Sequence, residues 1–112
     1  MSKEKETVFA LTNGRPSVKF DLHKSKKAAL ALRALNHKLR QQILKFIDEN
    51  KETMVTPVYK KLRIEQSVAS QHLAILRRAG LVTATRDGKF IKYKVNYENC
   101  SDLIKFVDNL IK

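Results

Sequence analysis

One predicted helix, over residues 65–79, carries side chains suited to hydrogen bonding with a large polar partner. With a step of about 100° per residue, its apolar residues gather on one side. The opposite side consists of small or polar residues: Gln66, Ser67, Ser70, Gln71, Ala74, Arg77 and Arg78. Gln and Ser can bond to base edges, and Arg suits phosphates. Because small side chains allow close approach, this pattern is typical of a helix that enters the major groove of DNA.

The positive charge of the chain is large and unevenly distributed. The net charge is +12; residues 57–94 carry nine Lys or Arg and two acids, whereas residues 95–112 carry two and three. A basic surface of this kind attracts polyanions through counterion release and long-range steering. Residues 57–94 therefore favour a nucleic-acid partner, and the last residues need another role.

Length and composition limit the class of protein. A chain of 112 residues is long enough for one domain with a modest core. Its single cysteine, Cys100, excludes an internal disulfide framework and favours a reducing compartment. No apolar run approaches the roughly 18 residues of a membrane span, and the first residues lack the apolar core of a signal peptide. We expect a cytoplasmic protein that does not bind membranes.

Two helices are predicted before the polar-faced helix. The first covers residues 21–35, with Asp21 as its N-cap, and its centre is apolar on nearly every side. Such a helix must be covered on every side, so in a chain this short we expect a second subunit to cover it. Asn36 is the expected N-cap of the second helix, which has a single apolar stripe.

The first twenty residues are only weakly patterned. Asn13-Gly14 is a hairpin signal, but Pro16 makes the second arm a poor strand. We therefore divide the chain into a weakly structured N-terminal arm, residues 1–20, and one domain, residues 21–112.

A short helix, a turn and a hairpin surround the polar-faced helix. Thr56 as N-cap and Pro57 at the first helical position predict the start of the short helix. Gly80 suits the left-handed end of the polar-faced helix. Alternating runs on either side of Asp87-Gly88 then predict a hairpin, and an amphipathic helix closes the chain. This order is the layout of a winged helix-turn-helix, a mostly α fold with a small β-hairpin.

Three stretches of the sequence resemble the ArsR/SmtB family of winged-helix repressors. The first is EQSVASQHLAILRRAGLV, similar to the family's Gln-Ser-x-x-Ser-x-His-Leu-x-x-Leu core and Ala-Gly-Leu-Val exit. The others are RDGKFIKYKV, similar to its wing, and ALNHKLRQQIL, similar to its second helix. The likeness covers residues 27–110. Glu65 departs from it, because the family usually has Ser, Thr, Asp or Asn there; Glu caps a helix less well but still complements its dipole.

The resemblance implies a homodimeric, sequence-specific transcriptional repressor on a palindromic operator in double-stranded DNA. The implied contacts in the recognition helix are Gln66, Ser67, Ser70, Gln71, Arg77 and Arg78, and those in the wing are Arg86, Lys89 and Lys92. The family dimerises through its first and last helices. The corresponding residues are Leu30, Leu32, Leu103, Phe106, Val107 and Leu110.

Many members of the family sense metals, but the ligands that they use are missing from this sequence. The short helix has neither Cys nor His, and the last helix has no His. We therefore expect no metal and no cofactor, and the sequence does not identify an effector. His72 falls on the core side of its helix, as a packed histidine with a hydrogen-bond partner. Cys100 fits an inert thiol better than a reactive one, although a position near a helix start can activate a thiol.

Two other classes of function stay open. The winged helix could bind proteins, or it could bind DNA without sequence preference as an architectural protein. A protein-binding module should lose no binding when Arg77, Arg78 and Lys89 are made neutral. An architectural protein should lack the large difference in affinity between operator and random DNA that a specific regulator shows. No nucleophile–base arrangement, phosphate loop or carboxylate pair indicates an enzyme, and we expect none.

Overall fold

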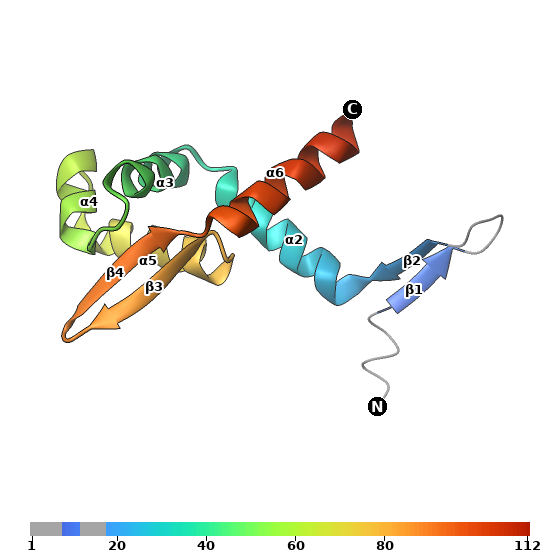
Figure 1. Ribbon diagram of the computed structural model, residues 1–112, viewed down its shortest axis with the longest axis horizontal. Helices are drawn as coiled ribbons and strands as arrows, with labels where there is room; N and C mark the ends of the chain where they lie inside the picture. Colours follow the sequence, from blue (N-terminus) through green and yellow to red (C-terminus); the bar gives the residue numbers. More distant parts are fainter. Residues whose placement is uncertain (1–7, 12–17) are drawn as a thin grey trace.

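The computed structural model describes residues 8–11 and 18–112, and the described part has five helices and two antiparallel hairpins. The elements are β1 (Val8–Leu11), β2 (Val18–Asp21), α2 (Leu22–Leu35), α3 (Lys38–Asn50), α4 (Val55–Leu62), α5 (Gln66–Arg78), β3 (Val82–Asp87), β4 (Phe90–Val95) and α6 (Tyr97–Ile111). The helices α3, α4 and α5 form one body, from which β3 and β4 project as a wing (Figure 1). The predicted winged helix-turn-helix layout is present.

The N-terminal hairpin differs from the irregular arm that the sequence favoured. β1 and β2 pair antiparallel, with Val8 opposite Asp21 and Leu11 opposite Val18. Pro16 precedes β2 instead of interrupting it, so the proline does not remove a hydrogen bond from that strand. Asn13-Gly14 lies outside the described residues. The hairpin extends from the start of α2, at the opposite end of the molecule from the wing (Figure 1).

Two predicted helix boundaries are confirmed by their capping bonds. The Asp21 carboxylate accepts hydrogen bonds from two backbone N–H groups in the first turn of α2. At the end of α5, Gly80 has a φ of 78°. Its N–H donates to the Arg77 carbonyl at 2.9 Å, and the N–H of Leu81 donates to the Leu76 carbonyl at 3.0 Å. This pair of bonds is a Schellman motif, which satisfies carbonyls that the helix leaves free.

Two other predicted helix starts are wrong by a residue or two. α3 is capped by His37 and not by Asn36. α4 has Met54 at its N-cap position in place of Thr56, and no side chain caps it. Pro57 therefore lies in the third position of α4, where a backbone N–H would still have no partner within the helix. The proline is tolerated for the predicted reason, at a different position.

The core joins all five helices to the base of the wing. Its buried side chains are Ala34, Ile43, Ile47, Val58, Ala69, Leu73, Leu76, Leu81, Val82 and Leu103. α2 contributes only Ala34 to this set, so most of the apolar surface of α2 lies outside it. In the described part of the chain, no helix is long and apolar enough to cross a membrane.

The wing turns one residue later than predicted. Asp87 pairs with Phe90 at the end of the hairpin, so the two loop residues are Gly88 and Lys89 in place of Asp87-Gly88. Gly88 has a φ of 65°, and glycine at the first of two loop positions fits the tight turns that hairpins favour. The shift places Lys89 at the tip of the wing.

The loop between α3 and α4 fastens the wing to the helical body. Thr53 lies opposite Tyr93 as an antiparallel bridge. The Thr53 N–H donates to the Tyr93 carbonyl at 3.1 Å, and the Tyr93 N–H donates to the Thr53 carbonyl at 2.8 Å. The start of α4 is therefore held beside β4.

Candidate nucleic-acid interface

α5 divides sharply into a buried face and an exposed face. Ala69, Leu73 and Leu76 are fully buried. The six residues predicted to contact DNA from this helix are all exposed, namely Gln66, Ser67, Ser70, Gln71, Arg77 and Arg78. The structure therefore brings these side chains together on one open surface. Such a surface is what base-edge contacts in the major groove require.

The turn that leads into α5 is closed by backbone bonds and not by a side-chain cap. Arg63 adopts the left-handed conformation at the end of α4, which costs about 1–2 kcal/mol for a residue other than glycine. The Ile64 N–H donates to the Tyr59 carbonyl at 3.1 Å. Glu65 occupies the N-cap position of α5 without a side-chain hydrogen bond, as expected for a poor cap. The first turn of α5 therefore has no hydrogen bond from the side chain at its N-cap position.

His72 is a structural residue. Nη1 of Arg40 lies 3.2 Å from Nδ1 of His72, and because arginine only donates, Nδ1 must accept. The same guanidinium donates to the carbonyls of Ala34 at 2.7 Å and Arg33 at 3.0 Å. Burial, followed by the nearby charges of His37 and Arg40, lowers the pKa of His72. The neutral imidazole therefore joins α5 to α2 and α3, which confirms the packed role predicted for it.

The three basic residues of the wing that were predicted to contact DNA differ in their surroundings. Arg86 and Lys89 are exposed, and within the described part of the chain neither lies in an ion pair. Lys92 lies 3.2 Å from an oxygen of Asp87 and 3.9 Å from an oxygen of Glu52. The charge of Lys92, for which the family resemblance implies a DNA contact, is already compensated by acids within the protein.

A groove of about 280 Å³ lies between the start of α4, the exposed face of α5 and the wing. Its lining residues are Met54, Val55, Thr56, Ser70, Lys89, Phe90, Ile91 and Tyr93. Phe90 is 54% exposed although it is a large apolar residue. Phe90 was not among the predicted contact residues; the available signal was an apolar side chain beside the wing turn, on the strand side that also carries Lys92 and Lys94. We call this the α5-side groove.

A second groove, of about 310 Å³, lies between the end of α3, the start of α4 and β4. Its lining residues are Asn50, Glu52, Thr53, Met54, Pro57 and Lys92. We call it the α3-side groove.

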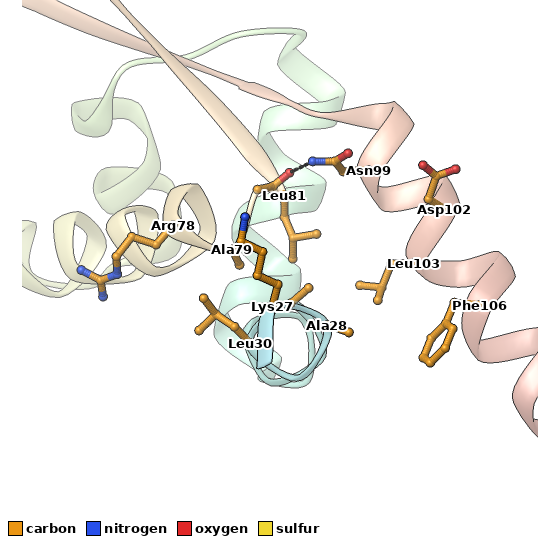
Figure 2. Close-up of a pocket in the computed structure, with 12 residues that line it drawn as sticks. Lys27, Ala28, Leu30, Arg78, Ala79, Leu81, Asn99, Asp102, Leu103 and Phe106 are labelled. Carbon is orange, nitrogen blue, oxygen red and sulfur yellow. Dashed lines mark hydrogen bonds between the residues drawn. The ribbon is translucent and has the colours of Figure 1, made fainter. Parts of the chain in front are cut away.

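The predicted dimer residues fall into two groups. Leu103 is only 8% exposed and belongs to the protomer's own core, against which Leu32 also packs. Phe106 and Leu110 are 46% and 70% exposed; Leu30 is also exposed and Val107 is half-buried. A cavity of about 510 Å³ lies between α2, the end of α5 and α6, and Leu30, Leu103 and Phe106 line it. Leu103 and Phe106 project from α6 into the space beside α2 (Figure 2).

The start of α6 is fastened to the end of the recognition helix. Nδ2 of Asn99 donates to the Gly80 carbonyl at 2.9 Å, the dashed bond in Figure 2. The Asn96 N–H donates to the Leu81 carbonyl at 2.9 Å. Cys100 points its thiol toward the same Leu81 carbonyl at 3.7 Å, and burial raises the pKa of that thiol. A thiol that stays protonated is a poor nucleophile, so Cys100 fits the inert role.

Among the described residues, no group of three or more His, Cys, Asp and Glu side chains could hold a metal ion. His37 and His72 approach each other, with ring centroids 4.9 Å apart. Nδ1 of His37 already accepts a hydrogen bond from the Leu39 N–H at 3.2 Å, and Nδ1 of His72 lies 3.2 Å from the guanidinium of Arg40. Both Nδ1 atoms therefore already have hydrogen-bond partners within the protein.

These features define a DNA-binding winged helix-turn-helix, and the comparisons with known proteins identify its family. The sequence profile described as "Bacterial regulatory protein, arsR family" matches residues 37–84. An uncharacterised HTH-type transcriptional regulator of Methanocaldococcus jannaschii is 34% identical over 89 residues, which is 80% of this chain and 100% of that protein. The chain belongs to the ArsR family of DNA-binding transcriptional regulators, which are not enzymes.

Other relatives differ in the direction of regulation that their names give. The transcriptional activator HlyU of Vibrio cholerae is 34% identical over 77% of this chain and 79% of its own length. The structure of the transcriptional repressor PagR of Bacillus anthracis has a TM-score of 0.63 at 26% identity, over 78% of this chain and 99% of PagR. The solution structure of a homodimeric winged helix-turn-helix domain from Mycobacterium bovis has a TM-score of 0.66 at 26% identity. The match covers 79% of this chain and 81% of that domain.

Proposed function

We propose that this protein is a cytoplasmic, sequence-specific repressor that binds a palindromic operator as a homodimer. The exposed polar face of α5 carries the proposal, because it presents Gln66, Ser67, Ser70 and Gln71 together with two arginines at its end. In this mode α5 enters the major groove and the wing approaches the adjacent minor groove.

Base readout is assigned to the glutamines and serines, and backbone contact to the cations. An exposed glutamine can bond an adenine edge with two hydrogen bonds, worth about 1–3 kcal/mol of discrimination. Gln71 lies near the middle of α5, one residue after Ser70 of the α5-side groove. Arg77, Arg78, Arg86 and Lys89 supply the phosphate contacts, which fix register without reading sequence.

The proposed homodimer covers the apolar surface that one protomer leaves open. Phe106 and Leu110 on α6, and Leu30 on α2, are exposed apolar side chains, and apolar surface gathered in one place is typical of a protein–protein interface. A twofold assembly that packs α2 and α6 against their copies buries all three. The homodimeric neighbour from M. bovis supports this arrangement, and a twofold protein matches a palindromic site.

Repression follows from occupancy. A dimer on two adjacent major grooves blocks other proteins from the same DNA, and this requires no further surface. The similarity to the repressor PagR favours this direction, whereas the similarity to HlyU favours activation. We propose control without a metal, because the described residues offer no cluster of suitable ligands.

Selection of bound fragments from random DNA, followed by titration of the selected site, tests specificity. A palindromic consensus is expected. Gln71→Ala should weaken binding to that site by about tenfold or more, with little effect on random DNA. Gln42→Ala, at an exposed glutamine of α3, is the matched control. Equal binding to selected and random DNA would instead identify an architectural protein.

The dimer is tested separately by a charge in its proposed interface. Phe106→Asp should convert the dimer to monomers in sedimentation equilibrium and should abolish binding to the palindrome at protein concentrations that saturate with the wild type. Asn109→Asp places the same charge on the polar side of α6 and should leave both unchanged. A Phe106→Asp protein that stays dimeric would remove α6 from the interface.

A further inference from the structure

The α5-side groove lies where a strand of DNA has to pass. Major and minor grooves of a duplex are separated by one sugar–phosphate backbone. A protein with one element in each of two adjacent grooves must therefore hold that backbone between the two elements. α5 and the wing are such a pair, and the groove between them is lined by both, through Ser70 on one side and Lys89 and Phe90 on the other.

We propose that the α5-side groove binds one sugar–phosphate backbone, with Phe90 packed against its deoxyribose rings. The proposal rests on the proposed function, and it adds a residue and a type of contact that the charge pattern does not reveal. The occupant is a strand of duplex DNA. The groove is continuous with the exposed face of α5, on which base contacts are assigned.

The polar side chains of the groove fit the phosphate. Lys89 carries a charge that no acid compensates within the described part of the chain, and it lies at the wing tip. Thr56 and Ser70 are exposed hydroxyls on the helical side of the same groove. Hydroxyl and ammonium groups are common partners of phosphate oxygens.

The apolar side chains fit the sugar. Phe90 is 54% exposed and Ile91 is 37% exposed, and neither belongs to the core. Deoxyribose presents C–H groups between successive phosphates, so a backbone alternates charged and apolar surface. A groove with a lysine next to an exposed phenylalanine matches that alternation, and covering Phe90 removes its ring from water.

Substitution at Phe90 tests the contact. Phe90→Ser should weaken binding to operator and to random DNA by the same factor, about tenfold, because sugars carry no sequence. The slope of log affinity against log salt should not change, since no charge is removed. Phe90→Leu should retain most of the affinity. Tyr97→Ser is the control, at an aromatic residue of α6 that is 57% exposed.

Photochemical cross-linking tests the position of the side chain directly. In a Phe90→p-benzoylphenylalanine protein, the ketone should abstract hydrogen from a nearby sugar and join the protein to one DNA strand. The same group at position 97 should not. An unchanged affinity for Phe90→Ser, or a loss confined to operator DNA, would overturn the proposal. Either result would leave the proposed function intact if Gln71→Ala weakened binding to the operator and not to random DNA.

Discussion

The two grooves beside the start of α4 contain the same types of residue and differ in charge. Each is lined by one wing lysine, by a threonine and by Met54. In the α5-side groove, Lys89 is free of acidic partners within the described structure. In the α3-side groove, Lys92 lies 3.9 Å from Glu52, which lines the same groove. Outside the groove, Asp87 also pairs with Lys92, and Lys94 pairs with Glu52.

The difference shows that a basic residue count overstates the surface available to phosphate. The charged residues that line the α3-side groove are Lys92 and Glu52, so their formal charges sum to zero. A phosphate there would have to displace an ion pair, although each exposed pair contributes only about 0–1 kcal/mol. A phosphate in the α5-side groove would meet an uncompensated cation.

The largest expected effect separates the two lysines. Lys89→Gln should weaken DNA binding about tenfold at moderate salt, because a hydrogen bond to a charged group contributes about 1.5–3 kcal/mol. It should also reduce the salt slope by about one. Lys92→Gln should change affinity by less than about twofold. Fluorescence anisotropy over a range of salt concentrations measures both. Equal losses would mean that phosphates use the α3-side groove as well.

A smaller effect in the opposite direction is expected from the acid that neutralises the lysines. Glu52→Gln should release Lys94, while Lys92 keeps its ion pair with Asp87. Affinity for random DNA should rise about two- to threefold, the scale of an exposed ion pair. The salt slope should become steeper. Glu49→Gln removes an exposed acid from the last turn of α3, just before the loop that carries Glu52, and serves as the control. If both variants gain equally, net charge and not the α3-side groove determines the change.

The smallest effect on DNA binding is expected from substitution of His72, which should change the stability of the fold and not the affinity for DNA. Burial lowers the pKa of His72 in the folded protein, so the unfolded chain takes up its proton at a higher pH. Stability is therefore lost as the pH falls below the ordinary value of about 6.5. The melting temperature should fall more between pH 7.5 and 5.5 in the wild type than in His72→Gln. The melting temperature of Lys89→Gln should fall over this pH range as much as that of the wild type, because Lys89 lies in a groove and has no contact with His72. If the melting temperature of His72→Gln fell as much as that of the wild type, His72 would not be the source of the pH dependence.

Local features of the fold could be predicted from the sequence because short-range chemistry determines them. Asp21 and Gly80 satisfy the ends of helices within a few residues of themselves, and the apolar spacing of α5 separates its buried and exposed faces. The caps at His37 and Met54 were missed because the preferred cap residues, Asn36 and Thr56, stand within two positions of them. The wing turn moved by one residue for the same reason, since Gly88 can occupy either loop position.

The charge state of the candidate site could not be predicted, because it depends on contacts between distant parts of the chain. Glu52 reaches Lys92 only because Thr53 pairs with Tyr93 and brings the loop after α3 against β4. Likewise, Phe90 becomes part of the α5-side groove through the position of the wing relative to α4. The alternation of a strand indicates two faces and does not say what each face meets.

The bonds from Asn99 and Asn96 to the end of α5 have a geometric consequence for the proposed dimer. These bonds join the start of α6 to the backbone of Gly80 and Leu81, directly after the end of α5. The separation of the two recognition helices is then determined by the angle at which two copies of α6 cross. A dimer reads half-sites about 34–36 Å apart, so a change in that crossing angle would shift one recognition helix relative to its groove.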